Sequence, residues 1–277
     1  MSNIAWSAQE RIDAYAILAD AGITGLEIAP GIFFHEAADP FVPDAVVART
    51  ALSEAADAGL ALVSMQSLLF GVTGAHLFEG AEARAVFERG MVRAITLAGR
   101  FGIPNLVFGS PVQRRVPDGL AMEDALAEAT AVFRRLGDAA AAAGTRISIE
   151  ANPVAYGTNF LNTLEEADAF VQAVDHPAIA LVLDLGAMHT NGDFATVPAR
   201  LAGLVPRLNH VHVSEPNLAP APADAVALLP VITGLRGAGY AKAVSIEMKR
   251  PPLGLAEVRR AVMRLVAAQR AAAVTHA

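Results

Sequence analysis

Cysteine is absent from this 277-residue chain, and aromatic side chains are few, with one tryptophan and three tyrosines. Without cysteine there are no disulfides, thiol nucleophiles or thiolate ligands, so any metal must be held by histidine, aspartate, glutamate or water. Basic residues are outnumbered as well: 21 Lys and Arg stand against 28 Asp and Glu, a formal net charge of −7. This balance argues against a protein that binds nucleic acid by neutralising its phosphates.

Targeting and membrane signals are also lacking. No basic segment followed by an apolar run opens the chain, so we expect no signal peptide and a cytoplasmic location. The longest charge-free stretch, residues 58–78, contains polar side chains and interior glycines, which suits a strand and its loop better than a membrane span.

What the chain does contain is a repeating unit: an alanine-rich helical segment, a glycine just beyond its end, and a short run of Ile, Val and Leu. Glycine at the end of a helix adopts the left-handed conformation without steric cost. The glycines of this pattern are Gly22, Gly59, Gly102, Gly144 and Gly239. The apolar runs predict eight strands, near residues 3–6, 23–28, 61–66, 104–108, 146–150, 180–184, 209–213 and 243–247.

Strands that alternate with helices predict a parallel sheet, and eight units in a chain of this length favour an α/β fold of the (β/α)8 TIM barrel type. A doubly wound sheet is the alternative, but no glycine-rich dinucleotide or phosphate motif supports it. No linker or change of composition divides the sequence, so we expect one domain over residues 1–277. The alanine-rich segment after Leu255 is expected to be the last helix.

The last four predicted strands end in, or carry near their ends, a potential metal ligand. These residues are Glu150, Asp184, His210, His212 and Glu247. Side chains alternate along a strand, and all five have the parity opposite to that of the apolar residues between them. If the apolar residues face the helices, the five polar ones face the barrel axis, at the end where barrel active sites are built.

Three carboxylates that converge at apolar strand ends are costly unless a cation or another partner compensates them. Two Glu, one Asp and one His favour Mn²⁺, Mg²⁺ or Co²⁺ over a structural zinc site. Any single acidic residue at a strand end is more often a helix cap or ion-pair partner, and only the repetition over four strands favours the metal. The residues leave open whether His210 or His212 is the ligand.

The segments that carry these residues resemble the xylose isomerase-like TIM barrels, and within them the sugar phosphate isomerases and epimerases that include ketose 3-epimerases. The resemblance covers nearly the whole chain and rests on NIAWS, GITGLEIAP, NLVFGSP, SIEANP, LVLDLGA, HVHVSEPN and VSIEM. It implies a divalent metal held by Glu150, Asp184, His212 and Glu247. It also implies a metal-stabilised enediolate, with Glu150 and Glu247 as the catalytic pair that moves a proton beside the substrate's carbonyl.

Three further substrate contacts of the ketose 3-epimerases are not matched, because Tyr156, Ala187 and Leu218 stand at their positions. The resemblance therefore implies a sugar other than the usual free ketohexoses. Polar groups at strand ends and in the following loops are the candidates for binding it, although some of them, Trp6 above all, are equally consistent with core positions. The candidates are Trp6, Gln66, Asn152, Tyr156, His189, His210, Glu215, Asn217 and Lys249, with Glu27 less favoured.

Two pairs of basic residues are candidate anion sites or simply solvated: Arg114 with Arg115, and Lys249 with Arg250. As partners we expect a small sugar, no nucleic acid and no membrane, and self-association is left open.

A metal-dependent isomerase or epimerase of carbohydrate metabolism is the favoured function. A lyase or dehydratase acting on a sugar, cyclitol or keto-glycoside would use the same site. A nuclease is disfavoured by the acidic charge and by only seven histidines, and a non-catalytic sugar-binding barrel is the remaining alternative.

Overall fold

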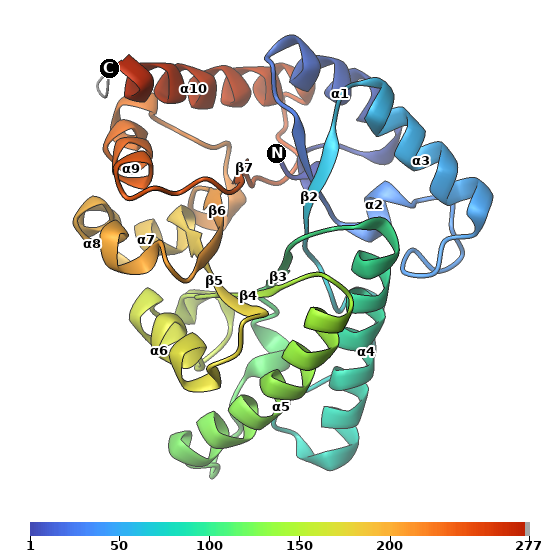
Figure 1. Ribbon diagram of the computed structural model, residues 1–277, viewed down its shortest axis with the longest axis vertical. Coiled ribbons are helices and arrows are strands. Elements are labelled where there is room, and N and C mark those ends of the chain that lie inside the picture. Colours follow the sequence, from blue (N-terminus) through green and yellow to red (C-terminus); the bar gives the residue numbers. More distant parts are fainter. Residues whose placement is uncertain (275–277) are drawn as a thin grey trace. The chain divides into compact units, whose positions relative to one another are not determined.

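Strands and helices alternate along the chain in the computed structural model, which describes residues 1–274 (Figure 1). Two compact units are formed: the first comprises Met1–Val63 and the residues from Asp184 onward, and the second comprises Ser64–Leu183. Within the described residues the strands are β1 (Gly25–Ile28), β2 (Ala61–Met65), β3 (Leu106–Phe108), β4 (Ile147–Glu150), β5 (Ile179–Asp184), β6 (Leu208–Val213) and β7 (Val244–Ile246). The expectation of a single domain stays a prediction.

Helices fill the intervals between the strands. They are α1 (Arg11–Asp20), α2 (Pro30–Phe33), α3 (Ala45–Asp57), α4 (Gly80–Phe101), α5 (Met122–Ala142), α6 (Leu164–Val174), α7 (Leu185–Asn191), α8 (Val197–Leu204), α9 (Ala225–Gly237) and α10 (Leu255–Val274). The predicted glycine ends are confirmed by positive φ angles. Gly102, for example, directly follows α4, has a left-handed φ of 64°, and donates its N–H to Ala98 O. No helix in the described part of the chain has the length and hydropathy needed to cross a bilayer.

The strand expected near residues 3–6 is wrong, whereas the other seven are confirmed to within a few residues. A short 3-10 helix (Asn3–Ala5) stands there instead. The ladder contacts move to the preceding residues, because Ser2 N–H bonds to Ile246 O and Glu27 N–H bonds to Met1 O, both at 2.9 Å. The amide side chain of Asn3 then bonds to the backbone of Ala29, accepting its N–H at 2.7 Å, so a side chain replaces the expected backbone pairing.

In the first unit, β6 and β7 pair in parallel, with Val211 opposite Val244 and Val213 opposite Ile246. Helix α10 packs against α9 and α1, as Figure 1 shows for the red C-terminal helix beside the orange and blue ones. Because β6 and β7 pair in parallel, their carboxyl ends lie side by side, which brings the polar residues at these ends together.

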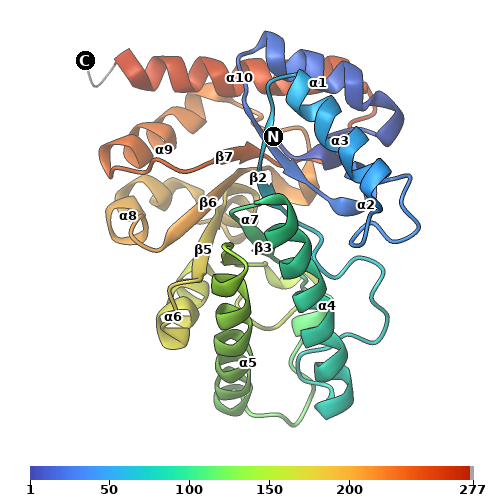
Figure 2. The ribbon, with the colours of Figure 1, turned by 45° about the vertical axis from the view of Figure 1, so that its right-hand side comes forward.

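In the second unit, β3 pairs in parallel with β4, and β4 with β5, so that Glu150 stands opposite Val182. Helices α4, α5 and α6 pack in sequence order (Figure 2). The core beneath them is aromatic: the ring of Phe133 lies edge-on to Phe108 at 5.0 Å and to Phe170 at 5.4 Å between centroids. These contacts pack α5 and α6 against Phe108 at the end of β3, the strand that pairs with β4.

Candidate metal centre

Three of the expected metal ligands converge in the first unit. Asp184 ends β5, His212 lies near the end of β6, and Glu247 directly follows β7. The Nδ1 atom of His212 lies 3.6 Å from Asp184 Oδ2 and 3.2 Å from Glu247 Oε2. The imidazole is fully buried, and the two carboxylates are 10% and 11% exposed. One nitrogen and two carboxylates therefore face a common point at the carboxyl ends of three strands.

Asp184 is held by two further contacts. Its Oδ1 atom accepts the N–H of Ala187 and so caps α7, while Oδ2 accepts a hydrogen bond from Ser214 Oγ at 3.0 Å. Ser214 Oγ in turn accepts the N–H of Gly186 at 2.8 Å. Ser214 was not among the site residues predicted from the sequence. The alternation of side chains could have indicated it, because Ser214 lies two residues beyond His212 and so points to the same side of the chain.

A second buried group lies behind His212. Both oxygens of Glu27, on β1, are 3.1 Å from His212 Nε2, and His210 Nε2 is 3.1 Å from Glu27 Oε2. All three side chains are fully buried. Burial by itself raises the pKa of Glu27, but attraction to the two imidazoles outweighs it and holds the pKa well below its ordinary value. Burial lowers the pKa of His210, with Glu27 opposing the shift. The structure thus directs Nδ1 of His212 toward Asp184 and Glu247, and His210 toward Glu27.

Glu150 lies in the second unit, at the end of β4. Its Oε2 atom accepts a hydrogen bond from Asn152 Nδ2 at 3.1 Å. A Cβ atom at Gly109 would come within 2.7 Å of the same oxygen, so a larger residue there would require the Glu150 carboxylate to shift. Its fixed position at a strand end agrees with the expectation, whereas its role as a ligand stays a prediction.

Arg114 does not form an anion site. Its guanidinium is fully buried and donates to the backbone oxygens of Glu150, at 2.8 Å, and Leu161, at 3.3 Å. Burial lowers the pKa of Arg114 to about 10, with Glu150 opposing the shift. The charge is therefore used to fix the backbone after β4 and is not presented to a ligand.

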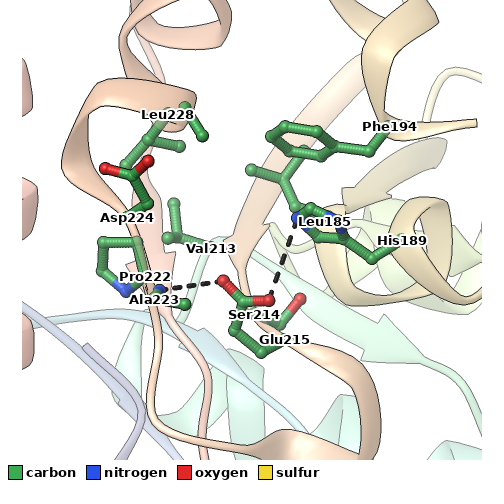
Figure 3. A pocket seen from close by; sticks show the side chains of 11 residues that line it. Leu185, His189, Phe194, Val213, Ser214, Glu215, Pro222, Ala223, Asp224 and Leu228 are labelled. Carbon is green, nitrogen blue, oxygen red and sulfur yellow. Dashed lines mark hydrogen bonds and ion pairs between the residues drawn. The ribbon is translucent and has the colours of Figure 1, made fainter.

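Two of the expected substrate contacts, His189 and Glu215, line a cavity of about 110 Å³ in the first unit (Figure 3). His189 Nε2 lies 3.8 Å from Glu215 Oε2, and its ring stacks on Phe194 with centroids 3.8 Å apart. The other oxygen of Glu215 accepts the N–H of Ala223 at 2.9 Å. Leu185 and Ser214, which adjoin or bond Asp184, belong to the same wall. The cavity is thus contiguous with the residues that hold Asp184.

The remaining substrate candidates differ in exposure. Trp6 is 1% exposed and meets Tyr15 edge-on, as expected of a core residue. Gln66 and Asn152 are also buried, Tyr156 is half-buried, and Asn217 and Lys249 are exposed. Their contacts with a substrate stay predictions.

Arg250, the other basic candidate, forms a two-pronged ion pair with Glu10: Nε to Oε2 at 2.7 Å and Nη2 to Oε1 at 2.8 Å. This pair ties the segment after β7 to the start of α1. Arg250 is thereby committed to a carboxylate of its own chain, which disfavours the anion-site interpretation.

The Glu10–Arg250 pair should make stability depend on acid pH. The hydrogen bond that Glu10 accepts from Arg250 is the main cause that lowers the pKa of Glu10 from 4.5 to about 2. A depressed pKa stabilises the folded state above the unfolded pKa, and the gain is lost as pH falls through the folded one. We expect Arg250→Gln to lower the urea midpoint slightly at about pH 7 and by less at about pH 2, where Glu10 is partly protonated in the folded protein. An equal deficit at both values would contradict this.

Comparison with known proteins supports the fold. No curated protein sequence matches the chain significantly. Among solved structures, a D-psicose 3-epimerase from Clostridium cellulolyticum H10, crystallised with D-tagatose, has a TM-score of 0.73 at 16% identity, covering 99% of this chain and 96% of that one. A 3-keto-D-glucoside 4-epimerase from E. coli gives 0.74 at 16%, covering 96% and 97%.

A D-allulose 3-epimerase from Methylomonas sp., in complex with D-allulose, has a TM-score of 0.70 at 22% identity, covering 98% of this chain and 92% of that one. At these identities the similarity shows a shared fold. The family model described as xylose isomerase-like TIM barrel matches residues 15–266, which confirms the expected fold class. The chain belongs to the xylose isomerase-like TIM barrel family.

Proposed function

We propose that the protein is a divalent-metal-dependent isomerase or epimerase that acts on a sugar or a sugar derivative. The observation that carries this proposal is the convergence of Asp184, His212 and Glu247 at the ends of β5, β6 and β7. The barrel family supports it, because active sites of TIM barrels are built at this end of the strands. We also propose that both units form one barrel domain, since the family match spans them.

The donors fit a hard divalent cation. Two carboxylates and one imidazole nitrogen face the same point. The two negative charges repel each other there unless a cation lies between them. Glu150 is the fourth ligand that we propose, from the end of β4. Oxygen-rich donor sets suit Mn²⁺, Mg²⁺ or Co²⁺, and no thiolate is available. Such an ion would polarise the substrate's carbonyl and so acidify the adjacent C–H bond.

Glu150 and Glu247 are the residues that we propose to move the proton. Inverting a carbon centre requires one base that removes the proton from one face and one acid that returns a proton to the other. A carboxylate pair at two strand ends supplies both, with the roles exchanged in the reverse direction. Asn152 orients Glu150 through its hydrogen bond to Oε2.

The cavity beside Asp184 is the proposed place for a part of the substrate remote from the reacting carbon (Figure 3). His189 and Glu215 offer one polar edge, and Leu185, Val213 and Leu228 an apolar wall. Tyr156, Ala187 and Leu218 replace the contacts expected for free ketohexoses, which supports a modified sugar. The proposed substrate-binding set is Gln66, Asn152, Tyr156, His189, Glu215, Asn217 and Lys249, whereas Trp6 and His210 are fully buried.

Deuterium exchange tests the proposal. The protein, loaded with Mg²⁺, is incubated in D₂O with ketoses, ketose phosphates, keto-glycosides and inososes, and followed by NMR. We expect deuterium at the carbon beside the carbonyl of at least one compound, together with its epimer or isomer. Exchange with loss of a β-substituent would instead indicate a lyase or dehydratase. Metal binding without any exchange over the panel would contradict an isomerase of these sugars.

A further inference from the structure

Glu27 is a charged side chain that the proposed reaction does not use, although it is as buried as any residue of the core. It lies on β1, is 0% exposed, and meets His212 and His210 on β6. A carboxylate in such a place is strongly destabilising unless it is paired and hydrogen-bonded. Glu27 contacts Nε2 of His212, the nitrogen that faces away from the other candidate metal ligands, and this position suggests a function for its buried charge.

The role follows from the chemistry of imidazole. A neutral ring can present a lone pair from one nitrogen only when the other nitrogen carries the proton. His212 Nε2 lies 3.1 Å from both oxygens of Glu27, which are acceptors, while Nδ1 faces Asp184 and Glu247. A neutral His212 that donates its Nε2–H to Glu27 would leave its lone pair on Nδ1, toward Asp184 and Glu247.

We propose that Glu27 is a positioning residue of the metal centre: by accepting the Nε2–H of His212 it fixes the tautomer and ring orientation that present Nδ1 to the cation. This inference rests on the proposed function, since it presupposes that His212 binds a metal. Carboxylates that orient ligating histidines in this way raise metal affinity.

His210 completes the arrangement. Its ring stands edge-on to His212, with centroids 5.0 Å apart, and its Nε2 lies 3.1 Å from Glu27 Oε2. It therefore places a second buried imidazole beside the same carboxylate. His210 lies two residues before His212 on β6, so both side chains point to the same side of the strand.

The test compares metal binding and His212 protonation in the full-length protein. Calorimetric titration with Mn²⁺ is done on the parent, on Glu27→Gln, which keeps the size but removes the charge, and on Glu123→Gln, an exposed residue of α5, as the matched control. We expect one ion per chain, an affinity about 10- to 100-fold lower for Glu27→Gln, and no change for the control.

The Zn²⁺-loaded parent needs no variant: its ¹H–¹⁵N spectrum should show His212 protonated on Nε2 and bare on Nδ1. Protonation on Nδ1, or unchanged Mn²⁺ affinity in a folded Glu27→Gln protein, would overturn the inference alone. Two ions per chain would overturn it in favour of a second metal bound by Glu27, His210 and His212. Failure of the parent to bind any ion would overturn the proposed function with it.

Discussion

Replacement of Glu247 by Gln is expected to reduce epimerisation of the substrate about 10²- to 10⁴-fold, the usual contribution of a positioned acid or base. Gln has the same shape but cannot take or return a proton. Exchange with D₂O should behave differently from net conversion. One epimer should still exchange its proton through Glu150, whereas the other should exchange only through Glu247 and so become inert.

Glu150→Gln should show the reverse preference between the two epimers, and this asymmetry is the diagnostic result. Metal content must be measured in both variants, because both residues are also proposed ligands. Glu123→Gln, exposed in the first turn of α5, serves as the control and should convert both epimers at the parent rate. Loss of exchange from both epimers in each variant, with the metal still bound, would contradict a mechanism with two bases.

Replacement of Phe133 by Ala is expected to lower the free energy of unfolding by about 3–5 kcal/mol. The ring is 1% exposed and lies among Phe87, Phe108 and Phe170, so truncation leaves a cavity that three rings cannot close without moving. Urea unfolding followed by circular dichroism measures the loss. If part of the second unit unfolded separately, the urea curve would show a second transition.

Phe70→Ala is the matched control, because the side chain of Phe70 belongs to the same unit but is 58% exposed. We expect a change within about 0.5 kcal/mol for it. If the two substitutions cost the same, the aromatic core is not what holds α5 and α6 against β3.

Much of the architecture was determined by the sequence because its signals are local. A glycine after five of the helices and the apolar runs along the chain depend on neighbouring residues only, and the apolar runs located seven strands. Side-chain parity likewise placed Asp184, His212 and Glu247 on one side of their strands before any strand was seen to pair.

The tertiary structure decided the matters that depend on partners distant in the chain. Glu27 and His212 are 185 residues apart, and only folding brings them together and so distinguishes His212 from His210. Glu10 forms an ion pair with Arg250, which is 240 residues away in the chain. Two backbone oxygens accept hydrogen bonds from Arg114. The amide of Asn3 replaces a strand by bonding to Ala29. In each case the residue type was evident from the sequence, but its partner was set by packing, which no local pattern records.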